Sequence, residues 1–526
     1  MPKLKTSKWP LSLLLVGLFV LTVAIRIPVL RSVGETWDEY AVVYYGETYY
    51  SAFKNLDFSV SSWEQNYEHP PVAKYIYGLS RQVTKKIPFI KALDSEYHSD
   101  KEYTLPRVVS AIFGGLTVVL VFLIGSTLFN RKIGLASSLI LSVLPHFIAY
   151  TSIASLESIF IFFTTFFIYC LIKALKSNNW RWHLATVIAL TLSFATRFNG
   201  TFFVALYAVI IVFFYRQQLL KLKFKEIPWP VLLSPIIFLG LFFALWPWLW
   251  ITPFNIIKTF QHSSGGHTGE YFLGSLGQPG WYYYIVYFLV TTPEVMLVLF
   301  GIFIYTLIRK LASWKLEVGI RSWKYFLLLA WFLTPFLASF VAFKQNGIRY
   351  AVYFMPALAL MSGVALIKLL DAVKKSIYKI MVAVIAMVGL LYPVVLFYPY
   401  YLDYYNLASG GPKAAYENRS FVISWWGEGG LAAVRYINQN APRGAVVRTL
   451  FTPAHTLIKF RDDLAIHNGY DPLGHDDYIL TNTYYDWYGN PKNLVDLKNY
   501  KVVYGMATPN WSLFSAPLVR VYKRVI

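Results

Sequence analysis

The chain has 526 residues, of which 56% are hydrophobic and 14% are charged, and its formal net charge is +21. Soluble domains contain about 25% charged residues, so this composition excludes an ordinary water-surrounded fold. The excess of Lys and Arg does not indicate a nucleic-acid partner, because the basic residues fall in small clusters between apolar runs. The single cysteine, Cys170, excludes an internal disulfide and a thiolate metal site.

Apolar segments long enough to cross a membrane, which requires about 20 residues, recur along the first 398 residues. The first begins at Leu11, after three lysines, and continues to Leu30 without a small-residue cleavage site, which favours a spanning helix over a signal peptide. The hydropathy pattern predicts about eleven helices, at residues 11–30, 107–129, 133–150, 157–175, 183–196, 198–215, 230–250, 282–308, 325–343, 350–368 and 380–398.

The short connections between these helices predict their orientation, because cytoplasmic connections are enriched in Lys and Arg. Alternate connections are basic, at residues 131–132, 173–181, 216–225, 309–324 and 368–379. The opposite connections hold few basic residues: Arg197, Lys258, Lys344 and Arg349. This asymmetry predicts a plasma-membrane protein with a cytoplasmic N-terminus and, after an odd number of crossings, an extracytoplasmic C-terminal segment.

Two long segments face outward in this arrangement: the first outer loop, residues 31–106, and the C-terminal segment, residues 399–526. Together they contain 21 of the 27 acidic residues. The C-terminal segment has helical spacing at 430–438 and strand-like runs at 445–451, 501–504 and 518–522. We therefore expect an all-α polytopic membrane domain over residues 1–398 and a small α/β extracytoplasmic domain over residues 399–526.

The first outer loop contains two motifs that can carry chemistry. The acidic pair Asp38-Glu39 can supply a general base or bind a cation, and it can equally be solvated surface or cap a helix that begins near Tyr40. The second motif is Glu68-His69-Pro70-Pro71, followed by Lys74. Its two prolines fix two φ angles, so that His69 and Lys74 are displayed from a stiff turn.

Together these motifs resemble the dolichyl-phosphate-mannose–protein mannosyltransferase superfamily, which includes the bacterial aminoarabinose transferases acting on lipid A and has the GT-C membrane fold. Glu157, in Ala154-Ser155-Leu156-Glu157, lies where that family tends to have an acidic residue, and Arg349-Tyr350 is a further similarity. Residues 399–406 and 426–429 are similar to the junction between the membrane and C-terminal domains of prokaryotic members. The resemblance extends from residue 35 to about residue 430.

The resemblance implies a glycosyltransferase that moves a monosaccharide from a polyprenyl-phosphate donor to a protein, lipid or glycan acceptor outside the cytoplasm. Displacement at the sugar C1 requires a base for the acceptor hydroxyl and positive charge for the departing phosphate. The family's key acidic residue maps onto Asp38 as the base, with Glu39 assisting it. Glu157 is either a third catalytic carboxylate or a carboxylate that complements a helix dipole. The candidate phosphate ligands are Arg349, Lys74 and Arg197.

Several alternatives stay open at this point. Glu68 and His69, beside Glu39, can contribute to a divalent metal site, and His262 and His267 can add ligands. Two departures from the family leave the acceptor open. The loop at 251–280 is short, whereas eukaryotic members carry a large insert there. The pair Glu68-His69 stands where lipid A enzymes tend to have Glu-Lys.

Two other classes of protein share parts of this pattern. A secondary transporter places ionisable residues near the bilayer midplane, whereas the acidic residues here concentrate outside. A lipid-linked oligosaccharide ligase or polymerase has a similar topology, but it does not predict the Asp-Glu and His-Pro-Pro pairing. The aromatic run at 398–405 fits either an interfacial belt or a surface that flanks the sugar or its lipid.

Overall fold

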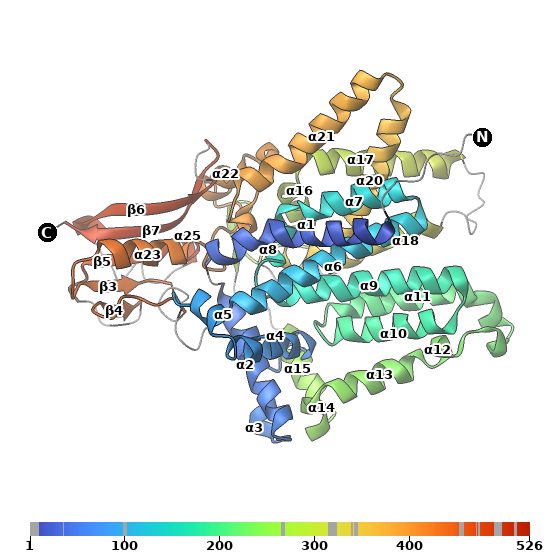
Figure 1. Cartoon of the computed structure of the whole chain (residues 1–526), viewed down its shortest axis with the longest axis horizontal. Helices are drawn as coiled ribbons and strands as arrows, with labels where there is room; N and C mark the ends of the chain where they lie inside the picture. Colours follow the sequence, from blue (N-terminus) through green and yellow to red (C-terminus); the bar gives the residue numbers. More distant parts are fainter. Residues whose placement is uncertain are drawn as a thin grey trace.

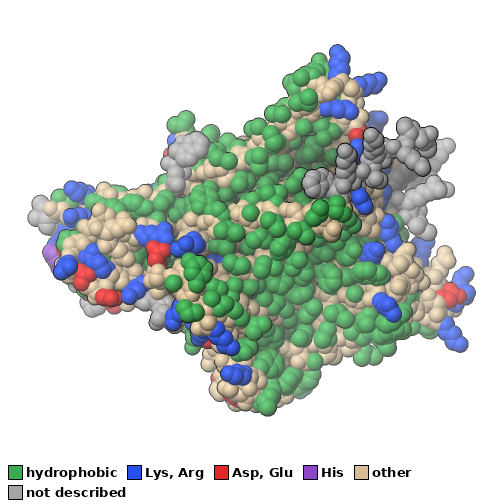
Figure 2. Space-filling view, in the orientation of Figure 1, with side chains coloured by type: hydrophobic (Ala, Val, Ile, Leu, Met, Phe, Trp, Pro, Cys, Tyr) green, Lys and Arg blue, Asp and Glu red, His purple; other side chains and the backbone are tan. Residues whose placement is uncertain are grey.

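A computed structural model describes most of the chain, namely residues 10–34, 36–97, 103–264, 269–313, 323–337, 340, 346–451, 457–469, 471, 474–488, 497–509 and 513–525. Most of the long helices run approximately along the long axis of the molecule, and a β-sheet lies at one end of that axis (Figure 1). Hydrophobic side chains cover the middle of the face seen in Figure 2, whereas Lys and Arg lie mainly toward its ends. This distribution fits a protein whose central part lies in a bilayer.

Seven helices among the described residues are long and apolar enough to span a membrane. They are α1 (Leu11–Ser32), α6 (Thr104–Leu128), α9 (Leu156–Ser177), α11 (Gly200–Leu220), α17 (Glu294–Ser313), η3 (Arg349–Phe354) continued by α20 (Met355–Ala372), and α21 (Ser376–Leu396). The chain is therefore a multi-pass membrane protein. The other predicted crossings contain shorter helices: α7 (Arg131–Ser142) with α8 (Pro145–Tyr150), α10 (Trp180–Phe194), α12 (Trp229–Leu232) with α13 (Ser234–Leu245) and α14 (Pro247–Ile251), and α18 (Trp323–Leu333). The count of eleven crossings stays a prediction.

Prolines divide several of the predicted crossings. The prediction of one helix at 282–308 was wrong, because α16 (Tyr283–Thr291) ends before Pro293 and α17 begins after it. Pro293 has no backbone N–H, and Thr292 before it is extended, with ψ 132°. The same effect separates α7 from α8 at Pro145 and α13 from α14 at Pro247.

The first outer loop folds into four helices: α2 (Trp37–Lys54), α3 (Val60–Trp63), α4 (Val72–Thr84) and α5 (Pro88–Leu93). A capping box starts α2, in which the Glu39 carboxylate accepts a hydrogen bond from the Thr36 backbone N–H at 2.9 Å. Helices α2 and α4 touch backbone to backbone at two glycines. A Cβ placed on Gly78 would lie 2.1 Å from the Gly46 carbonyl oxygen, so these positions accept only glycine without a shift of the helices.

The C-terminal segment contains the mixed α/β structure that its sequence predicts. Its five-stranded sheet has the order β4-β3-β5-β7-β6, in which β3 is parallel to β4 and β5, and β7 is antiparallel to β5 and β6. The main elements are α22 (Gly411–Glu417), α23 (Gly430–Asn440), β3 (Val446–Thr449), β4 (Ala465–Asn468), β5 (Tyr478–Asn482), α25 (Thr483–Tyr488), β6 (Tyr500–Thr508) and β7 (Ala516–Arg524). The predicted runs missed β4 and β5, which are short and flanked by polar residues.

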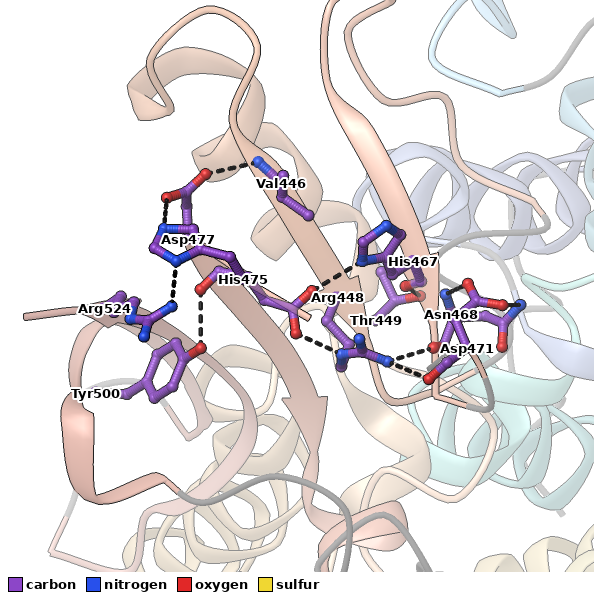
Figure 3. Close-up of polar contacts among 11 residues, drawn as sticks. Val446, Arg448, Thr449, His467, Asn468, Asp471, His475, Asp477, Tyr500 and Arg524 are labelled. Atoms are coloured by element: carbon purple, nitrogen blue, oxygen red, sulfur yellow. Dashed lines mark hydrogen bonds and ion pairs between the residues drawn. The ribbon is translucent and has the colours of Figure 1, made fainter. Parts of the chain in front are cut away.

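A buried arginine organises one edge of this sheet (Figure 3). Arg448 on β3 donates from Nε to Asp476 Oδ2 at 2.7 Å, and from Nη1 to the carbonyls of Asn468 and Asp471 at 3.0 Å. The other Asp476 oxygen lies 2.9 Å from His467 Nδ1. These contacts tie the turn after β4 and the residues before β5 to β3.

The first outer loop and the C-terminal segment share one hydrophobic cluster. Val43 of α2 and Tyr77 of α4 belong to the same buried cluster as Leu431, Val447 and Val521. The two segments therefore pack as one body at the end of the helix bundle where the sheet lies (Figure 1).

The aromatic run after α21 is largely buried in this junction. The hydroxyl groups of Tyr401 and Tyr405 donate to the carbonyls of Val394 and Val422, at 2.7 and 2.6 Å. Tyr398 is 42% exposed, whereas Tyr400, Tyr401, Tyr404 and Tyr405 are buried. Most of the run therefore joins the membrane helices to the C-terminal segment.

Candidate active site

The two carboxylates of the acidic pair have different surroundings. Glu39 is buried and accepts hydrogen bonds from Arg107 Nε at 2.7 Å, Arg107 Nη2 at 2.6 Å and the Ala154 backbone N–H at 2.8 Å. The Asp38 side chain keeps 30% of its surface exposed, and its Oδ2 pairs with Arg349 Nη2 at 2.5 Å. Asp38 is thus the carboxylate of the pair that solvent can reach, while Glu39 anchors the start of α2.

Arg349 connects Asp38 to a second carboxylate. Its Nε donates to Glu157 Oε1 at 2.6 Å, and Arg197 Nη1 pairs with the same oxygen. The four residues Asp38, Arg349, Glu157 and Arg197 form a chain of alternating charges, which we call the ion chain. Because Glu157, Arg349 and Arg197 are buried, their mutual attraction is screened less than that of surface pairs.

The ion chain has unused hydrogen-bonding capacity. Within the described part of the chain, Arg197 Nε, Arg197 Nη2 and Glu157 Oε2 are buried atoms without a hydrogen-bond partner. The Arg197 guanidinium also lies over the Tyr350 ring, 4.4 Å from its centroid. Buried donors of this kind are costly unless they bind a partner, and a guanidinium matches the oxygens of a phosphate. Glu157 lies in the first turn of α9, as a dipole-complementing carboxylate would, and it also binds both arginines.

Short connections place the two arginines. Arg197 lies in the turn between α10 and α11, and Arg349 opens η3. The two residues before Ile348, Asn346 and Gly347, have positive φ angles of 74° and 61°. Glu270, the first residue of strand β1 (Glu270–Phe272), accepts from the Asn346 N–H at 2.7 Å, so a buried carboxylate distant in the sequence holds the turn that presents Arg349.

Lys74 lies apart from the hydrogen bonds of the ion chain. Its ammonium group is buried and donates to the backbone carbonyls of Asn66 and His69, the latter at 2.9 Å. Burial lowers the pKa of Lys74 to about 7, while the nearby Glu68 opposes this shift. Lys74 therefore closes the turn that contains Pro70 and Pro71.

Two of the possible metal ligands lie together. Glu68 Oε2 is 3.2 Å from His262 Nε2, and both side chains are partly exposed. Within the described residues, no group of three or more His, Cys, Asp or Glu side chains could hold a metal ion. His267 lies outside the described residues, and a metal site stays a prediction.

Our sequence analysis missed Arg107 and the role of Trp426. Arg107 is the first residue of the apolar run that follows the acidic outer loop. A cation at the start of an apolar run is a sequence signal for a nearby carboxylate, which here is Glu39. The guanidinium carbon of Arg349 lies 4.3 Å from the centroid of the Trp426 ring. Nothing local in the sequence indicates that contact.

A protein-family model matches part of this chain. The family model of dolichyl-phosphate-mannose–protein mannosyltransferases matches residues 16–261, which include the acidic pair, Glu157 and Arg197. No curated protein matches the chain. Over residues 16–261 the chain is thus similar to this family, as its motifs predicted.

Several solved structures are similar to this chain. The chain is similar to ArnT from Cupriavidus metallidurans in the apo state, with 13% identity, a TM-score of 0.52 and coverage of 97% of this chain and 98% of that chain. It also matches ArnT bound to undecaprenyl phosphate, with 14% identity, a TM-score of 0.49 and coverage of 97% of each chain. The S. cerevisiae Pmt1-Pmt2 complex bound to the sugar donor matches at 23% identity and a TM-score of 0.34, over 50% of this chain and 35% of that chain.

Proposed function

We propose that this enzyme transfers a monosaccharide from a polyprenyl phosphate to an extracytoplasmic protein, lipid or glycan acceptor, with the ion chain as its active site. The observation that carries the proposal is the pairing of the partly exposed Asp38 with Arg349, which is itself tied to Glu157 and, through it, to Arg197. This arrangement brings together a base for the acceptor and cationic groups for the leaving phosphate.

In the proposed reaction, the oxygen of the acceptor hydroxyl forms a bond to the sugar C1. Asp38 takes the proton of that hydroxyl at the same time. The bond between C1 and the phosphate oxygen breaks, and the electron pair leaves with the polyprenyl phosphate. The transition state carries positive charge at the sugar, as in other glycosyl transfers. Arg349 and Arg197 stabilise the departing phosphate, because the guanidinium group binds phosphate oxygens through directed hydrogen bonds.

The Asp38–Arg349 pair also suggests an order of events. In the structure, Arg349 Nη2 engages one oxygen of the Asp38 carboxylate. A donor phosphate that draws Arg349 Nη2 to itself would free the Asp38 carboxylate for the acceptor. Donor binding would in this way activate the base, which limits the chemistry to the donor-loaded enzyme.

Glu39, Lys74 and the Pro70-Pro71 turn support this site in the proposal. Glu39 holds the start of α2 against Arg107 and so fixes the position of its neighbour Asp38. Lys74 fixes the turn that precedes α4. Both residues act by positioning, and a loss of either would distort the first outer loop.

Mass spectrometry of envelope glycolipids and glycoproteins, in cells with and without this gene, tests the proposal. We expect the deletion to remove one sugar unit from one class of acceptor, and the wild-type gene to restore it. A gene carrying Arg419→Gln, a change at an exposed residue of the C-terminal segment, serves as the matched control and should restore it fully. Identical glycolipids and glycoproteins in both cells would contradict the proposed function.

A further inference from the structure

A polar cavity lies at the end of the helix bundle away from the sheet. It has a volume of about 660 Å³, and its walls come from the turn between α9 and α10, from η1 (Phe224–Glu226) and from the start of α12. Figure 1 shows α12 and the connected ends of α9 and α10 at the side of the molecule opposite the sheet. Ligand pockets have volumes of about 300–1,000 Å³, so this cavity is large enough for a small polar ligand or a lipid headgroup.

The cavity is far from the ion chain. Helix α10 begins at Trp180, which lines the cavity, whereas Arg197 follows the other end of the same helix. The helix has 15 residues and is therefore about 22 Å long. Glu157 and the cavity likewise lie at opposite ends of α9. The cavity is thus a separate site, and its ligand does not depend on the proposed function.

The charged side chains of the cavity leave it positive. Arg181 and Lys225 line it, both are exposed, and within the described residues neither forms an ion pair with a carboxylate. Glu226, the carboxylate among the lining residues, pairs instead with Lys223 at 2.9 Å. A cleft whose cations are not neutralised raises the local concentration of anions. The cavity therefore favours an anionic ligand.

Two tryptophans form an apolar side of the cavity. The ring centroids of Trp180 and Trp229 are 5.7 Å apart, and each side chain is 45% exposed. The guanidinium carbon of Arg181 lies 5.7 Å from the centroid of the Trp180 ring. Exposed tryptophans beside basic residues are typical of the boundary between lipid and water. Leu232 and Leu233, which follow Trp229 along the chain, are also exposed, so the cavity adjoins a surface that suits acyl chains.

Two amide groups add hydrogen-bond donors to the wall of the cavity. Asn178 Oδ1 accepts from the Tyr215 hydroxyl at 2.9 Å, and Asn179 Oδ1 accepts from the Arg181 backbone N–H at 3.0 Å. Because these hydrogen bonds fix each amide by its oxygen, the nitrogen with its two N–H groups lies on the other branch of the side chain. Such donors match the oxygens of a phosphate.

We propose that this cavity binds the headgroup of an anionic phospholipid. The phosphate would lie between Arg181 and Lys225, and the acyl chains would follow the exposed apolar residues of α12. The connections that form the cavity are among those that the basic residues predict to be cytoplasmic, and the cytoplasmic leaflet carries the anionic lipids. Basic pockets between membrane helices bind anionic headgroups in this way. A zwitterionic headgroup carries its own cation beside the phosphate and would bind less well.

Cross-linking to the wild-type protein locates the lipid. The full-length protein is placed in phosphatidylcholine nanodiscs that contain phosphatidylglycerol with a photoreactive group near its headgroup, and the adducts are mapped by mass spectrometry. We expect adducts on residues 178–181 and 225–229, which an excess of ordinary phosphatidylglycerol should suppress. The same excess of glycerol 3-phosphate should leave them unchanged, and suppression by it would assign the cavity to a free phosphate ester instead. Adducts confined to other parts of the chain would overturn the proposal.

The double variant Arg181→Gln/Lys225→Gln tests the two cations. A cation near the membrane surface contributes about fivefold to the affinity for an anionic lipid, so this variant should bind phosphatidylglycerol about 25-fold more weakly than the wild type in native mass spectrometry. The charge-preserving variant Arg181→Lys/Lys225→Arg should keep most of the affinity.

The matched control is Lys374→Gln/Lys375→Gln, which removes two charges from the connection between α20 and α21 and should bind as the wild type does. Unchanged affinity in Arg181→Gln/Lys225→Gln would overturn the proposal. An equal loss in the control would do the same, because it would show attraction by net charge and not by the cavity. If Arg181→Gln/Lys225→Gln does not fold, the adducts on the wild-type protein decide.

Discussion

Asp38 and Glu39 show how adjacent residues of the same chemical type acquire different roles. Successive residues on an α-helix point about 100° apart, so the second and third residues of α2 face different neighbours. Glu39 turns back onto the helix start and meets Arg107, whereas Asp38 meets Arg349 at the edge of the buried region. The neighbours therefore favour a supporting role for Glu39 and leave Asp38 as the candidate base.

At the same scale, Arg349→Lys should raise the donor concentration needed for half-maximal rate by about tenfold, with kcat reduced less. Arg349 uses two different nitrogens to reach Asp38 and Glu157, and a lysine offers a single ammonium with no planar fork. The measurement is the initial rate against donor concentration in purified membranes. Arg419→Lys, an exposed position, is the control. An unchanged donor dependence in Arg349→Lys would exclude Arg349 as a phosphate ligand.

At the scale of the elements, the glycine contact between α2 and α4 determines the shape of the first outer loop. We expect Gly78→Ala to lower the stability of the protein by about 1–3 kcal/mol, because the new methyl group would overlap the Gly46 backbone. Thermal unfolding in detergent measures this loss. Gly240→Ala, on α13, where a Cβ meets nothing within 4 Å, should be neutral or slightly stabilising. Equal melting temperatures for the two variants would show that the helices can separate at little cost.

The sheet of the C-terminal segment depends in a similar way on one buried ion pair. Arg448→Ala should destabilise the segment by about 3–5 kcal/mol, because it leaves the Asp476 carboxylate buried without its main partner. The double variant Arg448→Met/Asp476→Leu removes both charges and should lose much less. Protease sensitivity of the C-terminal segment against temperature measures both losses. If the double variant is as unstable as the single one, packing and not the unpaired charge accounts for the effect.

At the scale of the whole molecule, hydropathy predicted the seven long apolar helices found among the described residues, and short motifs predicted a candidate site, because both signals are local. Hydropathy needs about 20 consecutive residues, and the motifs around Asp38 and Pro70 are each a few residues long. The contacts that complete the site are not local: Arg349 and Glu157 lie 192 residues apart, and they meet only through helix packing. The same limit explains why Arg107, Trp426 and the proline breaks were missed or misplaced, since each depends on tertiary contacts or on small departures from helical regularity.

The predicted orientation in the membrane is testable by cysteine labelling. Cys170 is buried, and Cys170→Ser would provide a cysteine-free background. In that background, Ser61→Cys should react with an impermeant maleimide in intact cells, because residue 61 lies in the first outer loop. Lys225→Cys, in a predicted cytoplasmic connection, should react only after permeabilisation. The reverse pattern would place the ion chain on the cytoplasmic side and contradict an extracytoplasmic transferase.

The most direct test of this account is the turnover of Asp38→Asn compared with that of the wild type at equal expression. Asparagine retains the shape of aspartate but cannot take a proton, and general base catalysis contributes about 10²–10⁴-fold to rate. We expect the variant to bind the lipid-phosphate donor and to lose at least about two orders of magnitude in sugar transfer. Sugar transfer at close to the wild-type rate would contradict the assignment of Asp38 as the base.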